Sequence, residues 1–265
     1  MFQDLKNQLA SEEKINKVNI KDIIDYCKCP KYYKLKNKDS NEFNLKEAYD
    51  KCLHKCFYCY LSGLQQDDIR SGIDTLKTRW GKEWIKLKKN SEIICTPSSF
   101  KRDTYDGKRK AGIDAIFTFY DIMEKDKQFP IAINKDYELQ ITPNIILTGT
   151  WEYIREIERN GNKIIQLIKF QTESNRFRTN HQINHDLELT AAALVFKTMF
   201  NIDEFEIAYV DIYLKKLILT TRSSGDFKTL KNTIISTIKS IENNLECISP
   251  DVTCYHCEYR NNCNF

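Results

Sequence analysis

The sequence predicts an α/β protein in which a mixed sheet is flanked by helices, with a helical amino-terminal part and a cysteine-rich carboxyl-terminal tail. Three observations indicate this class. Apolar residues recur at helical spacing through most of the first half, residues 129–172 alternate as strands do, and a further helix and two further strands follow them. Helices and strands that follow one another in this order are typical of α/β domains.

Residues 20–127 are predicted to be largely helical. Asn19 is a candidate N-cap for a helix that reaches Tyr26, stalls at Pro30 and resumes in the segment KYYKLK. Apolar residues three and four positions apart predict three longer helices, over 45–63, 67–89 and 110–125.

Residues 128–222 are predicted to form the sheet-containing core. Alternation and a high isoleucine content predict three strands, over 129–141, 144–158 and 163–172. The Asn-Gly pair at 160–161 predicts a hairpin turn between the last two. A helix from about Asp186 to Phe200 and two more strands, over 205–214 and 216–222, complete this part.

Residues 223–265 are expected to hold a long helix, over about 226–246, and the cysteine-rich tail. No internal repeat or low-complexity tract interrupts the chain, and glycine and proline are scarce. We therefore expect residues 1–265 to form a single domain.

Composition excludes several classes of protein. Apolar residues make up 41% and charged residues 29% of the 265 residues, which allows a sizeable core. The net charge of +4 permits a polyanionic partner without demanding one. The chain has no apolar run long enough to span a membrane, and its polar start MFQDLKNQLASEEK lacks the apolar stretch of a signal peptide. We expect a cytoplasmic protein without a membrane partner.

Ten cysteines in a reducing compartment point to metal or cluster ligation rather than to disulfides. Cys254, Cys257 and Cys263 form a C-x2-C-x5-C motif in the tail, and Cys29 is the natural candidate for a fourth thiolate. Four thiolates suit a 4Fe–4S cluster that would join the two ends of the chain. Structural zinc, with His256 as a possible substitute ligand, and unligated cysteines are the alternatives.

A second cysteine group lies in the segment KCLHKCFYCY. On one helix, Cys52, Cys56 and Cys59 share a face, while His54 points roughly opposite. These thiols could bind a metal with an outside partner, but small core residues are the commoner role for such cysteines.

The Cys-Pro followed by K-Y-Y-K-L, together with the terminal C-x2-C-x5-C, resembles the iron-staple branch of the RecB-like PD-(D/E)XK nucleases. That branch includes CRISPR-adaptation exonucleases and AddB-type helicase–nuclease subunits. The resemblance runs from about residue 20 to residue 265 and implies a restriction-endonuclease-like core. It also implies a 4Fe–4S cluster on Cys29, Cys254, Cys257 and Cys263.

The resemblance further implies an active site of separate pieces: a histidine on a helix, an acid on a strand, an acid-x-Lys on the next strand, and a Gln on the helix that follows. Such a site hydrolyses phosphodiesters with divalent metal ions. On the matching positions, this chain has His54, Glu152, Lys169, Gln171 and Glu188. Ala192 stands where the family has a Tyr.

A lysine at an acid position is the most damaging of these changes. A Mg²⁺ or Mn²⁺ site needs anionic oxygens, and an ammonium group adds repulsion instead. Residues 163–171 contain no acid, so no shift of register restores the acid-x-Lys motif. We therefore predict a nuclease-like protein that does not hydrolyse nucleic acid, and that binds nucleic acid or serves as a subunit of a nucleic-acid-processing complex.

Two alternatives stay open. Catalytic groups could have migrated to neighbouring positions, with Glu173 as a further acid and Lys169 as the catalytic cation, which would give an active DNA nuclease that uses Mg²⁺ or Mn²⁺. The chain could instead be a purely structural interaction subunit. For nucleic-acid contacts, we expect two basic groups to bind phosphates, Lys108, Arg109 and Lys110 before the fourth helix, and Arg176 and Arg178 beyond the degenerate strand.

Overall fold

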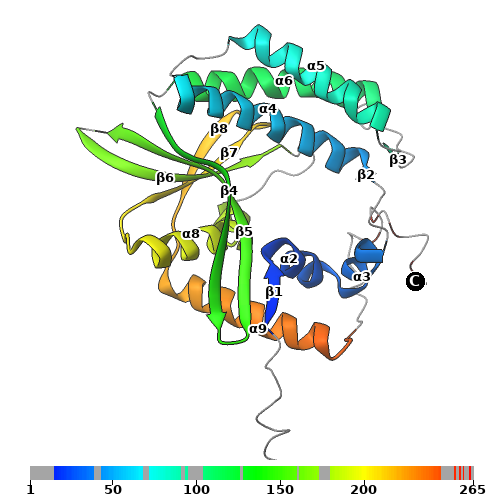
Figure 1. Cartoon of the computed structure of the whole chain (residues 1–265), viewed down its shortest axis with the longest axis vertical. Coiled ribbons are helices and arrows are strands. Elements are labelled where there is room, and N and C mark those ends of the chain that lie inside the picture. Colours follow the sequence, from blue (N-terminus) through cyan, green and yellow to red (C-terminus); the bar gives the residue numbers. More distant parts are fainter. Residues whose placement is uncertain are drawn as a thin grey trace, which may run out of the picture.

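The protein is built around a mixed sheet with helices on both faces (Figure 1). The predicted α/β class is therefore confirmed. The computed structural model describes residues 15–38, 43–67, 72–90, 93–94, 104–125, 128–159, 161–172 and 180–245, and Cys254, Cys257, Tyr259 and Cys263.

Within these described residues the sheet has six strands: β1 (Asn16–Asn19), β4 (Gln128–Thr142), β5 (Ile145–Arg159), β6 (Asn162–Gln171), β7 (Glu206–Asp211) and β8 (Lys216–Thr220). β5 is antiparallel to β4 and β6 and parallel to β1. β6 and β7 are parallel, and β8 is antiparallel to β7. Two short parallel strands, β2 (Phe43–Asn44) and β3 (Ile93–Ile94), pair apart from this sheet.

The helices form a layer on each face of the sheet. Their bounds are α2 (Ile20–Lys28), α3 (Pro30–Lys38), α4 (Leu45–Asp67), α5 (Ile73–Asn90), α6 (Tyr105–Glu124), α7 (Asn180–Asn184), α8 (Leu187–Phe200) and α9 (Ser224–Glu242). α4, α5 and α6 pack on one face, and α2, α8 and α9 pack on the other (Figure 1). The site described below lies between these two layers.

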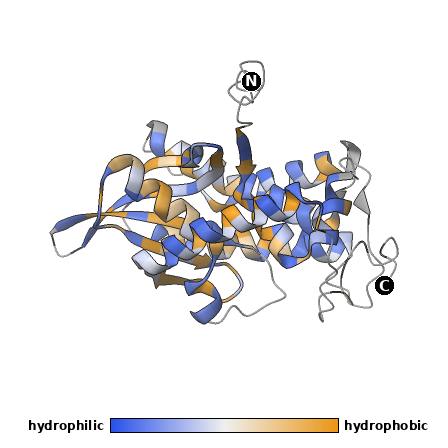
Figure 2. Cartoon of the chain, turned by 90° about the horizontal axis from the view of Figure 1, so that it is seen from below, coloured by the Kyte–Doolittle hydropathy of each residue, from blue (hydrophilic) through white to orange (hydrophobic). Residues whose placement is uncertain are grey.

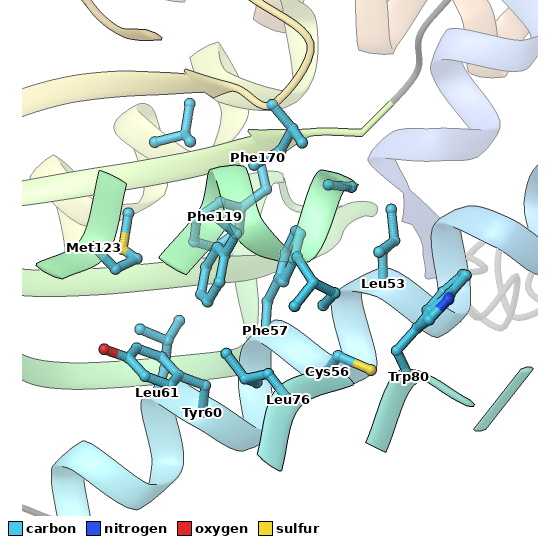
Figure 3. Close-up of a cluster of buried hydrophobic side chains, with 14 of the residues drawn as sticks. Leu53, Cys56, Phe57, Tyr60, Leu61, Leu76, Trp80, Phe119, Met123 and Phe170 are labelled. Carbon is cyan, nitrogen blue, oxygen red and sulfur yellow. The ribbon is translucent and has the colours of Figure 1, made fainter. Parts of the chain in front are cut away.

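The core under α4, α5 and α6 is rich in aromatic rings (Figure 3). Phe57 of α4 stacks on Phe119 of α6 with ring centroids 4.0 Å apart, and both contact Phe170 of β6 edge-on. Such contacts add to the area that the rings bury. They fix α4 and α6 against β6.

The core on the other face mixes aliphatic and aromatic side chains and centres on α8. The helix is buried from Leu189 to Phe196, and the N–H of Trp151 on β5 donates to the carbonyl of Ala192 at 3.0 Å. Figure 2 shows hydrophobic and hydrophilic residues side by side along many of the other helices, as expected where one side is buried. Within the described parts of the chain, no helix is long and apolar enough to cross a membrane.

Helix starts follow from local side chains. Asn19 caps α2, as predicted, by accepting a hydrogen bond from the Lys21 backbone N–H at 2.9 Å. Cys29 separates α2 from α3, and Pro30 takes the first position of α3, where its missing N–H costs nothing. The predicted hairpin is also confirmed: Gly161 has φ +78°, and Arg159 pairs with Asn162.

Several boundaries differ from the predictions. α4 continues to Asp67, so α5 begins only at Ile73. β1 was not predicted, because four residues with three polar side chains show no strand pattern. α7, β2 and β3 were also not predicted.

The start of α6 was predicted incorrectly. The helix begins at Tyr105, where Thr104 caps it, rather than near residue 110. Ile113 and Phe117 of this helix are exposed, at 37% and 40%. Gly112 instead faces the core, and a Cβ there would lie 2.0 Å from the Trp80 ring. This close approach sets the rotation of the helix.

Candidate functional site

The site lies where the edge of β5 passes from one neighbouring strand to another. β1 pairs with β5 from Ile145 to Thr148, and β6 pairs with it from Tyr153 onward. Residues 149–152 lie between the two pairings. Glu152 ends this stretch, and its Oε2 accepts a hydrogen bond from the Phe170 backbone N–H at 2.7 Å. Separating strands of this kind are a common place for a binding site in α/β proteins.

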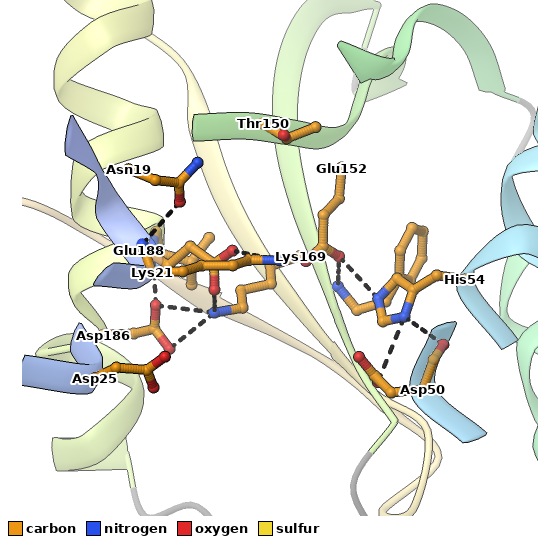
Figure 4. Close-up of polar contacts among 12 residues, drawn as sticks. Asn19, Lys21, Asp25, Asp50, His54, Thr150, Glu152, Lys169, Asp186 and Glu188 are labelled. Carbon is orange, nitrogen blue, oxygen red and sulfur yellow. Dashed lines mark hydrogen bonds and ion pairs between the residues drawn. The ribbon is translucent and has the colours of Figure 1, made fainter. Parts of the chain in front are cut away.

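His54 approaches Glu152 from α4 (Figure 4). Its Nε2 lies 3.4 Å from Glu152 Oε2, and its Nδ1 lies 3.4 Å from Asp50 Oδ1 and 3.0 Å from the Asp50 carbonyl oxygen. Thr172 also donates to the Asp50 carboxylate. Burial disfavours the charged ring, but Glu152 and Asp50 outweigh this and raise the pKa of His54 well above 6.5. The two carboxylates therefore favour the protonated form of His54.

The charge of His54 predicts a pH-dependent contribution to stability. A raised folded-state pKa stabilises the fold fully below pH 6.5, and this contribution is lost as pH rises through the folded pKa. We expect the difference in unfolding free energy between wild type and His54→Gln to be largest in mildly acidic solution and to shrink toward alkaline pH. Urea titrations at a series of pH values test this, and a pH-independent difference would contradict it.

Lys169 is a second internal cation, on the opposite side of Glu152 (Figure 4). Its Nζ lies 2.6 Å from Glu188 Oε2 and 3.3 Å from both oxygens of Asp186. The side chains of Lys169, Asp186 and Glu188 are only 13%, 6% and 17% exposed. Burial opposes the charge of Lys169, but the carboxylates outweigh it and raise its pKa. Burial would likewise raise the pKa of Glu188, but Lys169 lowers it.

The amino-terminal end of α8 holds this carboxylate pair in place. Asp186 is the N-cap and accepts a hydrogen bond from the Leu189 N–H at 2.9 Å, while Glu188 stands in the first turn. Carboxylates are favoured there by the helix dipole. Lys21, at the start of α2, completes the group with its Nζ 3.8 Å from Glu188 Oε1. The two acids thus belong to the start of α8, while the two lysines come from β6 and α2.

The cleft that Glu152, Lys169 and Glu188 line is small. Its volume is about 20 Å³, roughly the space that one water molecule needs. It is lined by Thr150, Trp151, Glu152, Tyr153, Leu167, Ile168, Lys169, Glu188, Leu189 and Ala192. No nucleotide fits in this space unless side chains move.

The structure brings four of the five predicted motif residues together. Glu152, Lys169 and Glu188 line the cleft, and His54 contacts Glu152 without lining it, whereas Gln171 does neither. The Tyr209 hydroxyl donates to Gln171 Oε1 at 2.6 Å, and Gln171 is 5% exposed. The side chain of Gln171 is therefore part of the packing between β6 and β7.

Sequence reasoning missed Asp50, Asp186, Lys21 and Tyr58. Asp50, His54 and Tyr58 are spaced four residues apart on α4, which is the spacing of one helix face. Burial raises the pKa of Tyr58, and Glu152 and Asp50 add to the effect, so this ring also lies close to the carboxylates. The spacing was visible in the sequence, but only the fold shows which face meets the sheet.

In the parts of the chain that the structure describes, no three His, Cys, Asp or Glu side chains are spaced to hold a metal ion. In the second cysteine group, Cys52 and Cys56 are buried in the core, at 4% and 0% exposure, as the commoner role predicts. Cys59 is exposed beside Arg79, so it does not share their environment.

The tail cysteines lie in a segment that is held beside Cys29 at two points. The Tyr26 hydroxyl donates to the Leu245 carbonyl at 2.8 Å, and the rings of Tyr32 and Tyr259 meet edge-on, 5.5 Å apart. In the sequence, Tyr26 and Tyr32 lie on either side of Cys29. Leu245 and Tyr259 lie on either side of Cys254 and Cys257.

The sulfur of Cys29 accepts a hydrogen bond from the Tyr32 backbone N–H at 3.5 Å, a contact of the kind that stabilises a ligating thiolate. Cys29, Cys254, Cys257 and Cys263 are all partly exposed, and none of them is in a disulfide. Their donor chemistry fits a thiolate-bound cluster, although the structure does not gather them at ligand spacing. His256, the alternative zinc ligand, lies outside the described residues.

The predicted basic cluster at 108–110 is wrong for Lys108. Lys108 is only 7% exposed and its Nζ lies 5.2 Å from the centroid of the Tyr49 ring, because α6 turns this residue inward. Arg109 and Lys110 are exposed. The other predicted contacts, Arg176 and Arg178, lie outside the described residues, as does Glu173.

Comparisons with known proteins add little. No protein-family model matches the chain. No curated protein matches it either. Among solved structures, it is similar to one described as "Crystal structure of SSO0001", with a TM-score of 0.38 and 12% identity over 99% of this chain and 93% of that one. Functional inference therefore depends on the residues of the cleft and the tail.

Proposed function

We propose that this protein is a nuclease-like protein of the PD-(D/E)XK type that has lost metal-dependent hydrolysis, and that it acts by binding nucleic acid within a nucleic-acid-processing complex. In the resembled nucleases, the positions of His54, Glu152 and Lys169 surround divalent metal ions. Here two of these three positions hold cations that are already paired with carboxylates.

The ammonium group of Lys169 between Asp186 and Glu188 is the observation that carries this proposal. It neutralises the carboxylates that would otherwise attract a divalent ion, and it repels a second cation at contact distance. The His54 ring already contacts two carboxylates, with Nε2 3.4 Å from Glu152 Oε2 and Nδ1 3.4 Å from Asp50 Oδ1.

A 4Fe–4S cluster held by Cys29, Cys254, Cys257 and Cys263 is part of the same proposal. When bound, such a cluster would supply four iron–thiolate bonds that join the two ends of the chain. The two contacts that place the tail beside α2 and α3 support this ligand set. We assign the cluster a structural role, because the cleft residues pair with one another rather than with the tail.

A nuclease assay tests the proposed loss of hydrolysis. We expect no cleavage of labelled single- or double-stranded DNA with Mg²⁺ or Mn²⁺, under conditions in which an active nuclease degrades both. The matched control is Glu152→Ala, which removes the remaining candidate metal ligand of β5. Divalent-dependent degradation that disappears in Glu152→Ala would establish an active enzyme with migrated catalytic groups. Degradation that persists in this variant indicates a contaminant.

A further inference from the structure

Helices α2 and α3 carry a basic surface that the sequence analysis did not single out. Residues 20–38 contain six lysines and two aspartates. Lys36 is paired with Asp25 at 2.8 Å and lies 3.7 Å from Glu47, so its charge is largely balanced. Lys28 and Lys34 are exposed, and Lys31 is partly exposed. We call Lys28, Lys31 and Lys34 the α2–α3 lysines.

An aromatic ring lies among these lysines. The Nζ of Lys28 is 4.4 Å from the centroid of the Tyr32 ring, and Tyr259 of the tail meets the same ring edge-on. Tyr32 is itself partly exposed. Lysines around a partly exposed aromatic ring provide both phosphate contacts and a stacking surface for a base.

α2 connects the cleft with the α2–α3 lysines. It begins beside the cleft, where Lys21 reaches toward Glu188 with a side chain that is 70% exposed, and it ends at Lys28, next to its C-cap Cys29. Asp22 and Asp25 lie between these two lysines, so the excess of lysines over acids in this region lies in α3. α5 and α6 lie on the far side of the sheet from α2 and α3 (Figure 1).

We propose that the α2–α3 lysines, with Tyr32, bind the phosphate backbone of a single nucleic-acid strand. This inference rests on the proposed function and names the surface that carries it out. It replaces the predicted cluster at 108–110, in which Lys108 is buried. A single strand fits better than a duplex, because only unpaired bases can stack on Tyr32.

The test compares two variants with equal loss of charge. The first carries Lys28→Gln, Lys31→Gln and Lys34→Gln. The control carries Lys82→Gln, Lys86→Gln and Lys228→Gln, which alter exposed lysines of α5 and α9. Thermal melts confirm that both are folded, and fluorescence anisotropy with labelled single-stranded and duplex DNA measures affinity at several salt concentrations.

We expect the α2–α3 variant to bind single-stranded DNA at least about tenfold more weakly and to show a salt dependence reduced by roughly 2 in logarithmic slope, from about 0.7 per lost phosphate contact. The control should bind nearly as wild type does. Equal losses in both variants, no loss in the first, or a preference of the wild type for duplex would overturn this inference alone. A wild-type protein that binds neither DNA would refute the nucleic-acid role in the proposed function as well.

Discussion

Replacing Lys169 with methionine will destabilise the protein by about 3 kcal/mol or more, because removal of one partner from a buried ion pair leaves uncompensated charge. The Asp186 and Glu188 carboxylates would face each other without the ammonium group that now lies 3.3 Å and 2.6 Å from them. Urea denaturation at neutral pH measures the effect. A loss below about 1 kcal/mol, the value typical of an exposed pair, would contradict the internal role of Lys169.

Two further variants show whether this loss comes from the carboxylates. Lys163→Met is the matched control on the same strand, because Lys163 pairs with Glu156 at the surface, and we expect little change. The double variant Lys169→Met/Glu188→Gln should recover part of the loss, since one unpaired charge is removed. A double variant that is less stable than Lys169→Met would show that packing rather than charge is responsible.

Replacing Cys29 or Cys257 with serine will remove most of the iron and lower the melting temperature. The purified wild type should be brown and contain about four iron atoms per chain. Loss of a clip that closes most of the chain costs on the order of 3–5 kcal/mol, or roughly 10 °C for a chain of this size. Metal analysis, visible absorbance and thermal melts measure these effects.

Cys27→Ser is the matched control for the cluster. Cys27 lies two residues from Cys29 but contacts the Thr237 hydroxyl, at 3.6 Å, and a serine can keep that contact. We expect its iron content and melting temperature to match the wild type. If metal analysis finds zinc instead of iron in the wild type, the site is a structural zinc site and not a cluster. Wild-type-like melting of Cys29→Ser would argue against any metal site that joins the two ends of the chain.

Features that depend on single elements could be predicted. The hairpin turn, the N-cap of α2 and the absence of an acid from residues 163–171 are all local properties of the sequence. The convergence of His54, Glu152, Lys169 and Glu188 followed from the resemblance, which aligned elements rather than distances. These residues therefore sit together as expected.

The carboxylates that pair with His54 and Lys169 could not be predicted from local sequence patterns. Asp186 appeared in the sequence only as a helix start, and its contact with Lys169 depends on how α8 crosses β6. The side chain of Gln171 is held away from the cleft by its hydrogen bond with Tyr209, which belongs to a strand much later in the chain. Lys108 is buried because Gly112 admits Trp80 and so fixes the rotation of α6. Each of these outcomes depends on tertiary packing.

The pairing of Lys169 with two acids also limits which neighbouring sequences evolution can reach. A glutamate at position 169 would place three carboxylates together, so that one substitution alone both removes an ion pair and adds repulsion. Changes at Asp186 or Glu188 alone leave the lysine buried without a full complement of partners. Substitutions at positions 169, 186 and 188 are therefore expected to depend on one another, so that a change of this charge arrangement needs concerted substitutions.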